Sequence, residues 1–228
     1  MRNDLDIRSE EDLAWQAADL VLREKGMDCG MQITVRKMIP TGAGLGGGSS
    51  DAAAVLWAVD RLTPPVLSVE AVHDLAAQLG SDVPLFLRGG LLRARGRGEA
   101  VSPVFPSRKE RFLLLVPPVH CATASVYREM APRIARARNG TDELQLGKND
   151  LYEAAVFLYP ELAQYSEAMA KLGADYAGMS GSGSTFYAAF SDAKHAERAR
   201  EYLREELPQA QVYLTQATST GFHVKGGK

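Results

Sequence analysis

Apolar residues first recur at helical spacing between residues 13 and 21, directly after a run of hydroxyl and acidic residues at 9–12. Such a run is typical of a helix N-terminus, so a helix is expected to begin there. Residues 31–37 then alternate apolar and polar side chains, which predicts a half-buried strand. A helix and a strand are therefore expected before the glycine-rich stretch at 42–48.

The residues after this stretch are strongly apolar. The run AAAVLWAV at 52–59 predicts a helix buried on nearly all sides, with Ser49, Ser50 and Asp51 as N-capping side chains. A second helical pattern covers 67–79 and ends at a glycine. Residues 83–88 and 91–95 have the pattern of two strands joined by a glycine turn.

Prolines and charges at 102–109 indicate a connection between two domains, 1–108 and 109–228. The elements predicted for the second domain are a strand at 112–116, a helix at 160–172, a strand at 185–190 and a helix at 192–206. Helices and strands alternate there, so a domain of mixed α and β structure is expected. The tail from residue 221 is expected to fray.

Composition excludes several functional classes. The chain has 228 residues, a net charge of -2 and 46% hydrophobic residues, which predicts a globular protein without the basic surface that nucleic acid or anionic membranes require. Its two cysteines form no CxxC motif, and no apolar run approaches the length of a membrane span. A cytoplasmic protein that acts on a small molecule is expected.

The glycine-rich stretch PTGAGLGGGSSD at 40–51 carries the chemistry. Glycines allow successive backbone N–H groups to face one concavity, and a helix N-terminus directly behind them adds positive potential. This combination predicts a phosphate site. The spacing of Gly42, Gly44 and Gly47 also fits a dinucleotide-binding loop. Such a loop requires an acidic residue about 20 residues later, at the end of a second strand, and no acidic residue stands in that position here. No lysine precedes Ser49, as a P-loop requires, and protein-kinase signatures are absent.

The stretch PTGAGLGGGSSDAA at 40–53 resembles the second motif of the GHMP small-molecule kinases, in which a proline and a glycine-rich turn lead to paired serines at the start of a helix. Further stretches agree in their order along the chain, namely LGSDVP at 79–84, GRGE at 96–99, NDL at 149–151 and MSGSGS at 179–184. The form GGGSSDAA is most similar to the branch of this family that acts on 4-diphosphocytidyl-2-C-methyl-D-erythritol.

The resemblance implies a two-domain GHMP kinase architecture of the α+β class. Its N-terminal domain would be ribosomal-protein-S5-like, its C-terminal domain ferredoxin-like, and ATP and substrate would bind between them. It implies transfer of the ATP γ-phosphate, with Mg²⁺, to a hydroxyl of 4-diphosphocytidyl-2-C-methyl-D-erythritol in non-mevalonate isoprenoid biosynthesis. Kinases of the homoserine or mevalonate type are the alternative within the family.

The resemblance also implies roles for individual residues. Asp82 would be the catalytic group that accepts or orients the substrate hydroxyl proton. The ATP phosphates would be bound by Pro40, Gly42, Gly44, Leu45, Gly46, Gly47, Gly48, Ser49 and Ser50, and Ser50 would also reach the metal. The substrate would be bound by Thr123, Tyr127, Gly181, Ser182 and Gly183, with the Tyr127 ring stacked on cytosine.

Structural alternatives stay open for several of these residues. Asp82 could cap a helix or turn, residues 181–184 could form a plain hairpin, and Tyr127 could belong to the core. Asn149 and Asp150 predict a helix cap. Arg93, Arg95 and Arg97 alternate on a predicted strand, where a solvated face is the simpler interpretation.

One part of the family pattern is missing. The family opens with a strand that bears a Pro-x-Lys-x-Asn-Leu motif, whose lysine neutralises transition-state charge, and residues 1–11 contain no such motif. The chain is therefore expected to lack the N-terminal catalytic segment. A catalytically impaired nucleotide-binding fragment is the competing hypothesis, and an exposed sheet edge could support a homo-oligomer.

Overall fold

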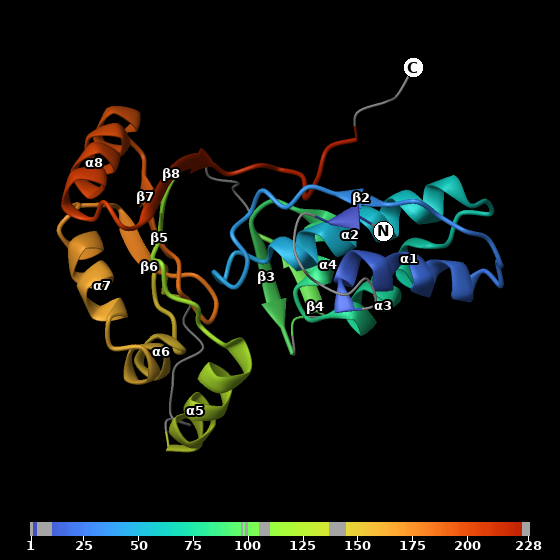
Figure 1. Cartoon of the computed structure of the whole chain (residues 1–228), viewed down its shortest axis with the longest axis horizontal. Helices are drawn as coiled ribbons and strands as arrows, with labels where there is room; N and C mark the ends of the chain where they lie inside the picture. The colour runs from blue at the N-terminus through green and yellow to red at the C-terminus, as the bar shows by residue number, and fades with distance from the viewer. Residues whose placement is uncertain are drawn as a thin grey trace. The chain divides into compact units, whose positions relative to one another are not determined.

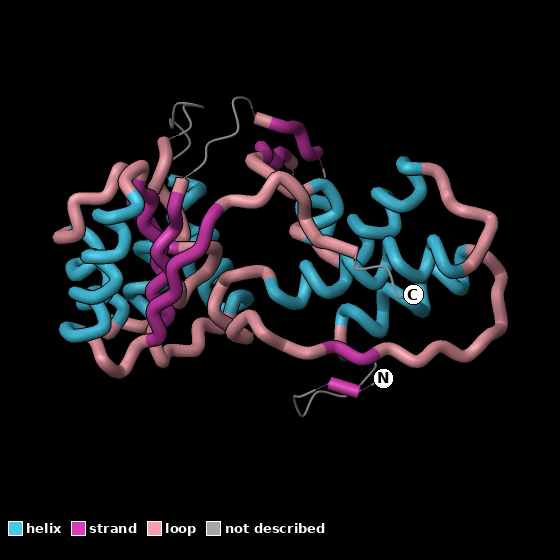
Figure 2. Tube along the Cα trace, turned by 90° about the horizontal axis from the view of Figure 1, so that it is seen from above, coloured by secondary structure: helices cyan, strands magenta, loops and turns pink. Residues whose placement is uncertain are grey.

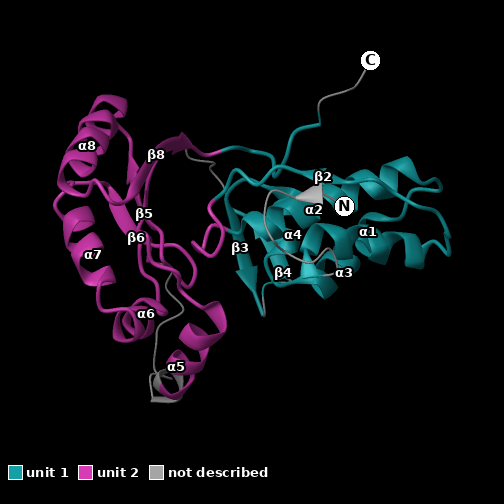
Figure 3. Cartoon of the chain, in the orientation of Figure 1, with its two compact units in different colours: residues 1–39, 46–108, 218–228 teal, residues 40–45, 109–217 magenta. Residues whose placement is uncertain are grey.

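The computed structural model describes residues 2–3, 11–96, 98, 100–104, 110–136 and 145–224 (Figure 1). The chain divides into two compact units (Figure 3). The first unit comprises residues 1–39, 46–108 and 218–228, and the second comprises 40–45 and 109–217. The predicted domains, 1–108 and 109–228, stay a prediction, and these units differ from them in two short segments, 40–45 and 218–228.

The first unit is mainly helical. Its elements are β1 (Arg2–Asn3), α1 (Leu13–Glu24), β2 (Thr34–Val35), α2 (Gly47–Leu62), α3 (Val69–Leu79), α4 (Val83–Arg88), β3 (Leu92–Arg95) and β4 (Ala100–Pro103). β1 pairs in parallel with β2, and β3 pairs antiparallel with β4. Ala17 and Ala18 of α1 and Ala52 and Ala53 of α2 are buried in one cluster, so these two helices approach closely.

A buried ion pair joins α1 to the end of α2. Lys25 Nζ lies 2.7 Å from Asp60 Oδ1, and the two side chains are only 4% and 2% exposed. Lys25 also donates to the carbonyl oxygens of Asp60 and Thr63, and Asp60 Oδ1 accepts from the N–H of Leu67. Burial alone would raise the pKa of Asp60, but these hydrogen bonds and the Lys25 charge hold that pKa below its ordinary value.

The segment after residue 217 returns to the first unit. The Phe222 ring lies 5.4 Å from that of Trp57 on α2, between centroids. A Cβ on Gly221 would collide with the Phe86 backbone on α4, so only glycine permits this close approach. The expected fraying is therefore wrong for Gly221 and Phe222, which are packed, while residues 225–228 lie outside the described part of the chain.

The second unit is a ferredoxin-like βαββαβ fold, as the resemblance implied. Its elements are β5 (Arg111–Val116), α5 (Thr123–Arg136), α6 (Tyr152–Leu158), α7 (Leu162–Ala170), β6 (Tyr176–Met179), β7 (Phe186–Phe190), α8 (Ala193–Glu206) and β8 (Gln211–Gln216). All neighbouring strands are antiparallel in the order β6-β7-β5-β8, and the sheet is seen nearly edge-on in Figure 2.

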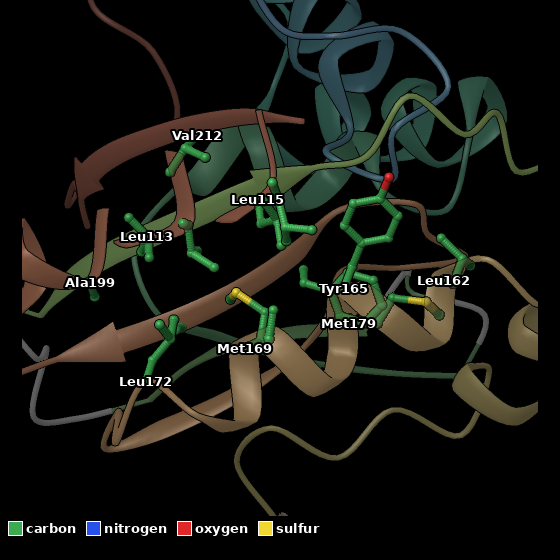
Figure 4. Packing of buried hydrophobic residues seen from close by; sticks show 14 of the residues in the cluster. Leu113, Leu115, Leu162, Tyr165, Met169, Leu172, Met179, Ala199 and Val212 are labelled. Atoms are coloured by element: carbon green, nitrogen blue, oxygen red, sulfur yellow. The ribbon is translucent and has the colours of Figure 1, made fainter. Parts of the chain in front are cut away.

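The core of this unit lies between the sheet and the helices α7 and α8. Leu113 and Leu115 point from β5 toward Tyr165 and Met169 of α7 (Figure 4). Alternate residues of β5 therefore face the core, as the period-2 pattern of a strand requires. Among the described residues, no helix combines the length and apolarity that crossing a bilayer would demand.

The structure corrects three local predictions. Residues 83–88 are not a strand but the short helix α4, because Pro84 is tolerated in a first helical turn, where an N–H has no partner to lose. The strand predicted at 31–37 is reduced to Thr34–Val35, the two residues that pair with β1. The helix at 52–59 is present, but its Ala54, Val55, Trp57 and Ala58 are only half-buried.

Candidate active site

The glycine-rich stretch forms a left-handed turn that leads into α2. Gly42, Gly44 and Gly46 have φ angles of 68°, 74° and 66°, which other residues adopt only at a cost. The first hydrogen bond of the helix runs from Ser50 N–H to Gly46 O at 2.9 Å. The N–H groups of residues 47–49 precede that bond, so they have no partner inside the helix and can bind an anion.

The predicted capping by Ser49, Ser50 and Asp51 is wrong. Gly46 occupies the N-cap position of α2 with no side-chain cap bond, because the helix begins at Gly47. Ser49 and Ser50 therefore lie inside the first turn, and their hydroxyls do not serve as caps. This shift places the paired serines beside the unpartnered N–H groups, where a hydroxyl can reach the same anion.

The lead-in to this turn packs against the second glycine motif, within the second unit. The Ser180 hydroxyl donates to Gly44 O at 2.8 Å, and Thr185 N–H donates to Ala43 O at 3.1 Å. A Cβ on Gly44 would lie 2.3 Å from Ser180 O. The structure thus brings together residues 42–45 and 180–185, which are more than 130 positions apart in the sequence.

Asn149 holds the second motif in place. Its Nδ2 donates to the carbonyl oxygens of Met179 (2.8 Å) and Gly181 (2.7 Å), while its Oδ1 accepts from the N–H of Leu151 at 2.8 Å. The N-cap residue of α6 is Leu151, so the cap predicted at Asn149 and Asp150 lies one to two residues too early in the sequence. The two carbonyl contacts were not predicted, since they join positions about 30 residues apart.

The candidate substrate residues cluster around α5. Thr123 Oγ1 and Ser182 Oγ are 2.9 Å apart, and Ser182 lies between Gly181 and Gly183 in the turn that Asn149 supports. Tyr127 follows Thr123 by one helical turn, on the same helix face, and is 57% exposed. Its exposure rules out the core alternative and leaves the ring available for stacking.

Asp82 lies in the first unit at the N-cap of α4, where its side chain makes no cap bond. The expected loop before a strand is wrong here, because Val83 and Pro84 are buried and start a helix that anchors the exposed Asp82. One turn further along α4, the Phe86 ring approaches Gly46, where a Cβ would lie 2.7 Å from it. Phe86 therefore packs one end of α4 against the start of α2.

One glycine of the GRGE stretch lies against Ser81, the residue before Asp82. Gly98 has a φ angle of 115°, and a Cβ there would lie 2.5 Å from Ser81 O. Arg93 and Arg95 alternate on β3, whereas Arg97 and Glu99 lie outside the described residues. Within the described ranges, no cluster of three or more histidine, cysteine or acidic side chains could bind a metal alone.

Sequence reasoning missed a charged network behind the glycine turn. Lys37 Nζ lies 2.8 Å from Asp51 Oδ2 and 3.2 Å from Asp12 Oδ2, and its side chain is 10% exposed. Burial lowers the pKa of Lys37, but the hydrogen bonds and charges of Asp51 and Asp12 outweigh it and raise that pKa. The network fastens the first turn of α2 to the N-cap of α1. No spacing in the sequence signalled this pairing.

Comparison with known proteins identifies the class to which this fold and its glycine-rich turn belong. Residues 12–90 match the GHMP kinase N-terminal domain, and residues 125–209 match the GHMP kinase C-terminal domain. The chain therefore belongs to the GHMP kinases, a family of small-molecule kinases that use ATP.

Within the family, curated relatives point to one branch. The chain is 36% identical over 219 residues to 4-diphosphocytidyl-2-C-methyl-D-erythritol kinase of Pelotomaculum thermopropionicum, a match that covers 90% of this chain and 76% of the relative. It is 37% identical over 207 residues to the enzyme of the same name from Syntrophomonas wolfei, covering 85% and 72%.

Solved structures agree with the fold. The crystal structure of a 4-(cytidine 5'-diphospho)-2C-methyl-D-erythritol kinase superposes with a TM-score of 0.75 at 35% identity, covering 94% of this chain and 81% of that one. Homoserine kinase from Cytophaga hutchinsonii gives a TM-score of 0.74 at 17% identity, covering 96% and 80%. The second likeness concerns the fold alone.

Proposed function

We propose that this chain transfers the γ-phosphoryl group of ATP to a hydroxyl of 4-diphosphocytidyl-2-C-methyl-D-erythritol, a step of isoprenoid precursor biosynthesis. The observation that carries the phosphoryl-transfer part is the N-terminus of α2, whose unpartnered N–H groups follow three left-handed glycines. The substrate is inferred from relatives that are named 4-diphosphocytidyl-2-C-methyl-D-erythritol kinase and are 36–37% identical to this chain over most of its length.

The proposed phosphate site consists of the turn and the first helical turn behind it. Its residues are Pro40, Gly42, Gly44, Leu45, Gly46, Gly47, Gly48, Ser49 and Ser50. Backbone N–H groups and the helix dipole would stabilise the β- and γ-phosphates without lysine or arginine in the turn itself. Mg²⁺ would neutralise charge between phosphate oxygens, and the Ser50 hydroxyl is the proposed protein ligand.

Asp82 is the proposed catalytic residue. Its exposed carboxylate would accept the substrate hydroxyl proton while the hydroxyl oxygen bonds to the γ-phosphorus and the bond to the β-phosphate oxygen breaks, which releases ADP. The buried Val83 and Pro84 limit the freedom of the backbone that presents it. Phosphoryl transfer depends chiefly on such positioning and on charge neutralisation.

The proposed substrate site is the cluster around α5. The exposed Tyr127 ring would stack on the cytosine, and the Thr123 and Ser182 hydroxyls, 2.9 Å apart, would bind polar groups of the substrate together with Gly181 and Gly183. Asn149 would keep this turn in shape through its two carbonyl contacts.

The test is an ATP-consumption assay with Mg²⁺ and 4-diphosphocytidyl-2-C-methyl-D-erythritol, run on the wild type, Asp82→Asn and the control Asp74→Asn. Asp74 is exposed on α3 and is not one of the proposed site residues, so its variant should match the wild type. Asp82→Asn should lose at least about a hundredfold in kcat, as expected for removal of a general base. Equal rates in all three proteins would contradict the assignment of Asp82.

Other acceptors separate the proposal from its alternatives. Homoserine and mevalonate should give no turnover, and turnover with either would move the chain to another branch. ATP binding without turnover of any acceptor would support the impaired nucleotide-binding fragment instead. A cytoplasmic location and a homo-oligomer through an exposed sheet edge stay predictions, and size-exclusion chromatography would test the second.

A further inference from the structure

The second unit contains a pocket of about 280 Å³ that the proposed reaction does not use. It is lined by Pro40, Thr41 and Ala43, by residues 116–120 at the end of β5 and directly after it, by Ser184, by Gln209 just before β8 and by Gln211 at its start. All of these belong to the second unit. Of the residues proposed to bind ATP or substrate, Pro40 is the one that also lines this pocket.

Ser184 supplies an unsatisfied polar group at the pocket. Its side chain is 1% exposed, and its hydroxyl has no hydrogen-bond partner among the described residues. Buried hydroxyls in folded proteins are almost always hydrogen-bonded, because an unmet one loses its bonds to water without replacement. A ligand that offers a donor or an acceptor would satisfy Ser184.

The other polar groups of the pocket are neutral amides, a hydroxyl and an imidazole. They come from Thr41, His120, Gln209 and Gln211. Two tyrosines orient the amides, since Tyr213 donates its hydroxyl hydrogen to Gln211 Oε1 at 2.6 Å and Gln209 Nε2 lies 3.5 Å from the Tyr165 hydroxyl. Among the residues that the structure describes, no lysine, arginine, aspartate or glutamate lines the pocket.

This lining disfavours ionic ligands. A phosphate or carboxylate taken from water would need arginine or lysine, and a metal cation would need carboxylates. The remaining surface is formed by Pro40, Ala43 and the run Val-Pro-Pro-Val at 116–119, which is apolar and rigid. Such walls fit the faces of a flat ring, while amide and imidazole groups fit its polar edge.

From this lining we infer a binding site for an uncharged nucleobase, presented by a free nucleoside. The volume of about 280 Å³ lies just below the range of about 300–1,000 Å³ that is typical of ligand sites, so the pocket admits one ring system and not a dinucleotide. The pocket adjoins the proposed phosphate site at Pro40 but goes beyond the proposed function, because binding there requires neither Asp82 nor the N–H groups at the start of α2.

The experiment is an NMR titration of the whole chain with adenosine, cytidine and uridine, at saturating ADP. At least one nucleoside should shift the His120 ring and the Gln209 and Gln211 side-chain amide signals, and the shifts should persist in Tyr127→Ala. Persistence under both conditions distinguishes this pocket from the proposed ATP and substrate sites. Displacement of the nucleoside by ADP, or loss in Tyr127→Ala, would overturn the inference.

A matched pair of variants tests the location. Gln211→Phe fills the pocket and removes an amide, so it should weaken binding at least about tenfold. Gln216→Phe makes the same exchange on β8 outside the pocket and should bind like the wild type. Thr41→Phe, from a different segment, serves as a second blocking variant should Gln211→Phe fail to fold. Unchanged affinity in a folded blocking variant, or no shift with any nucleoside, would refute the site.

Discussion

The buried pair Lys25–Asp60 gives the sharpest prediction about stability. In Lys25→Met the thioether side chain can occupy the space of the lysine stem, but the Asp60 carboxylate loses its cation at a position only 2% exposed. The carbonyl oxygens of Asp60 and Thr63 also lose their donor. Breaking one side of a buried pair typically costs about 3–5 kcal/mol, and we expect this range for the first unit.

The same helix offers a matched control. Arg23 pairs with Asp19 at 2.9 Å in an i,i+4 arrangement, but its side chain is 75% exposed. Arg23→Met should therefore cost no more than about 0.5 kcal/mol, since solvent screens such pairs. The two methionine variants remove one positive charge each from neighbouring positions, so the difference between them isolates the effect of burial.

Urea unfolding followed by tryptophan fluorescence measures both variants. Trp15 and Trp57 lie on α1 and α2, so the signal reports on the first unit. The difference in unfolding free energy between the two variants should shrink in acid. The pKa of Asp60 is lowered in the folded protein, so its ion pair contributes stability above the ordinary aspartate pKa of about 4. That contribution is lost as pH falls through the pKa of Asp60 in the folded protein. Equal losses in Lys25→Met and Arg23→Met near neutral pH would refute the reasoning.

Three further predictions concern the glycine turn, the cysteines and the lysine behind the turn. Gly44→Ala should lower the unfolding free energy of the second unit by at least about 2 kcal/mol, measured by circular dichroism in urea. The loss comes from the left-handed φ at this position and from a carbonyl oxygen that would lie 2.3 Å from the new Cβ. Gly30→Ala is the control and should be neutral, because nothing lies within contact distance of a Cβ there. Burial, and secondly the nearby Glu161 charge, raise the pKa of Cys121 to about 11. Mass spectrometry after alkylation near neutral pH should therefore find only the exposed Cys29 modified. Equal labelling of the two cysteines would contradict this prediction. Because the pKa of Lys37 is raised, the stability that this charged side chain contributes is complete at neutral pH and is lost as pH rises through that pKa. In Lys37→Met, the unfolding free energy measured in urea should therefore decline less at alkaline pH. An unchanged dependence of the unfolding free energy on alkaline pH would count against this prediction.

Periodicity in the sequence was sufficient for the long elements. The helix at 192–206 and the strand at 112–116 lie within one residue of α8 and β5, because each has a clear apolar face. The run 83–88 was assigned wrongly, since six mainly apolar residues fit a strand or a buried helix equally well. The strand at 31–37 was too long, because strand length depends on a partner that local pattern does not reveal.

In the candidate site too, local features could be predicted from the sequence, whereas contacts between distant segments could not. Glycine spacing predicted the tight turn before α2, because the conformations glycine permits are a local property, and phosphate binding there stays a prediction. The contacts of Lys37 with Asp51, and of Asn149 with the carbonyls of Met179 and Gly181, depend on segments that meet only in the folded chain. Neither was accessible from spacing or composition. The start of α2 at Gly47 was also missed, since three capping residues follow it.

The return of residues 218–224 to the first unit has a consequence for protein synthesis. The ribosome produces the whole second unit before Gly221 and Phe222, which pack against Phe86 and Trp57. During translation, α2 and α4 must therefore wait with these contacts unmade while residues 109–217 emerge. A chain that ended at residue 217 would contain the whole sequence of the second unit but a first unit that still lacks its last segment.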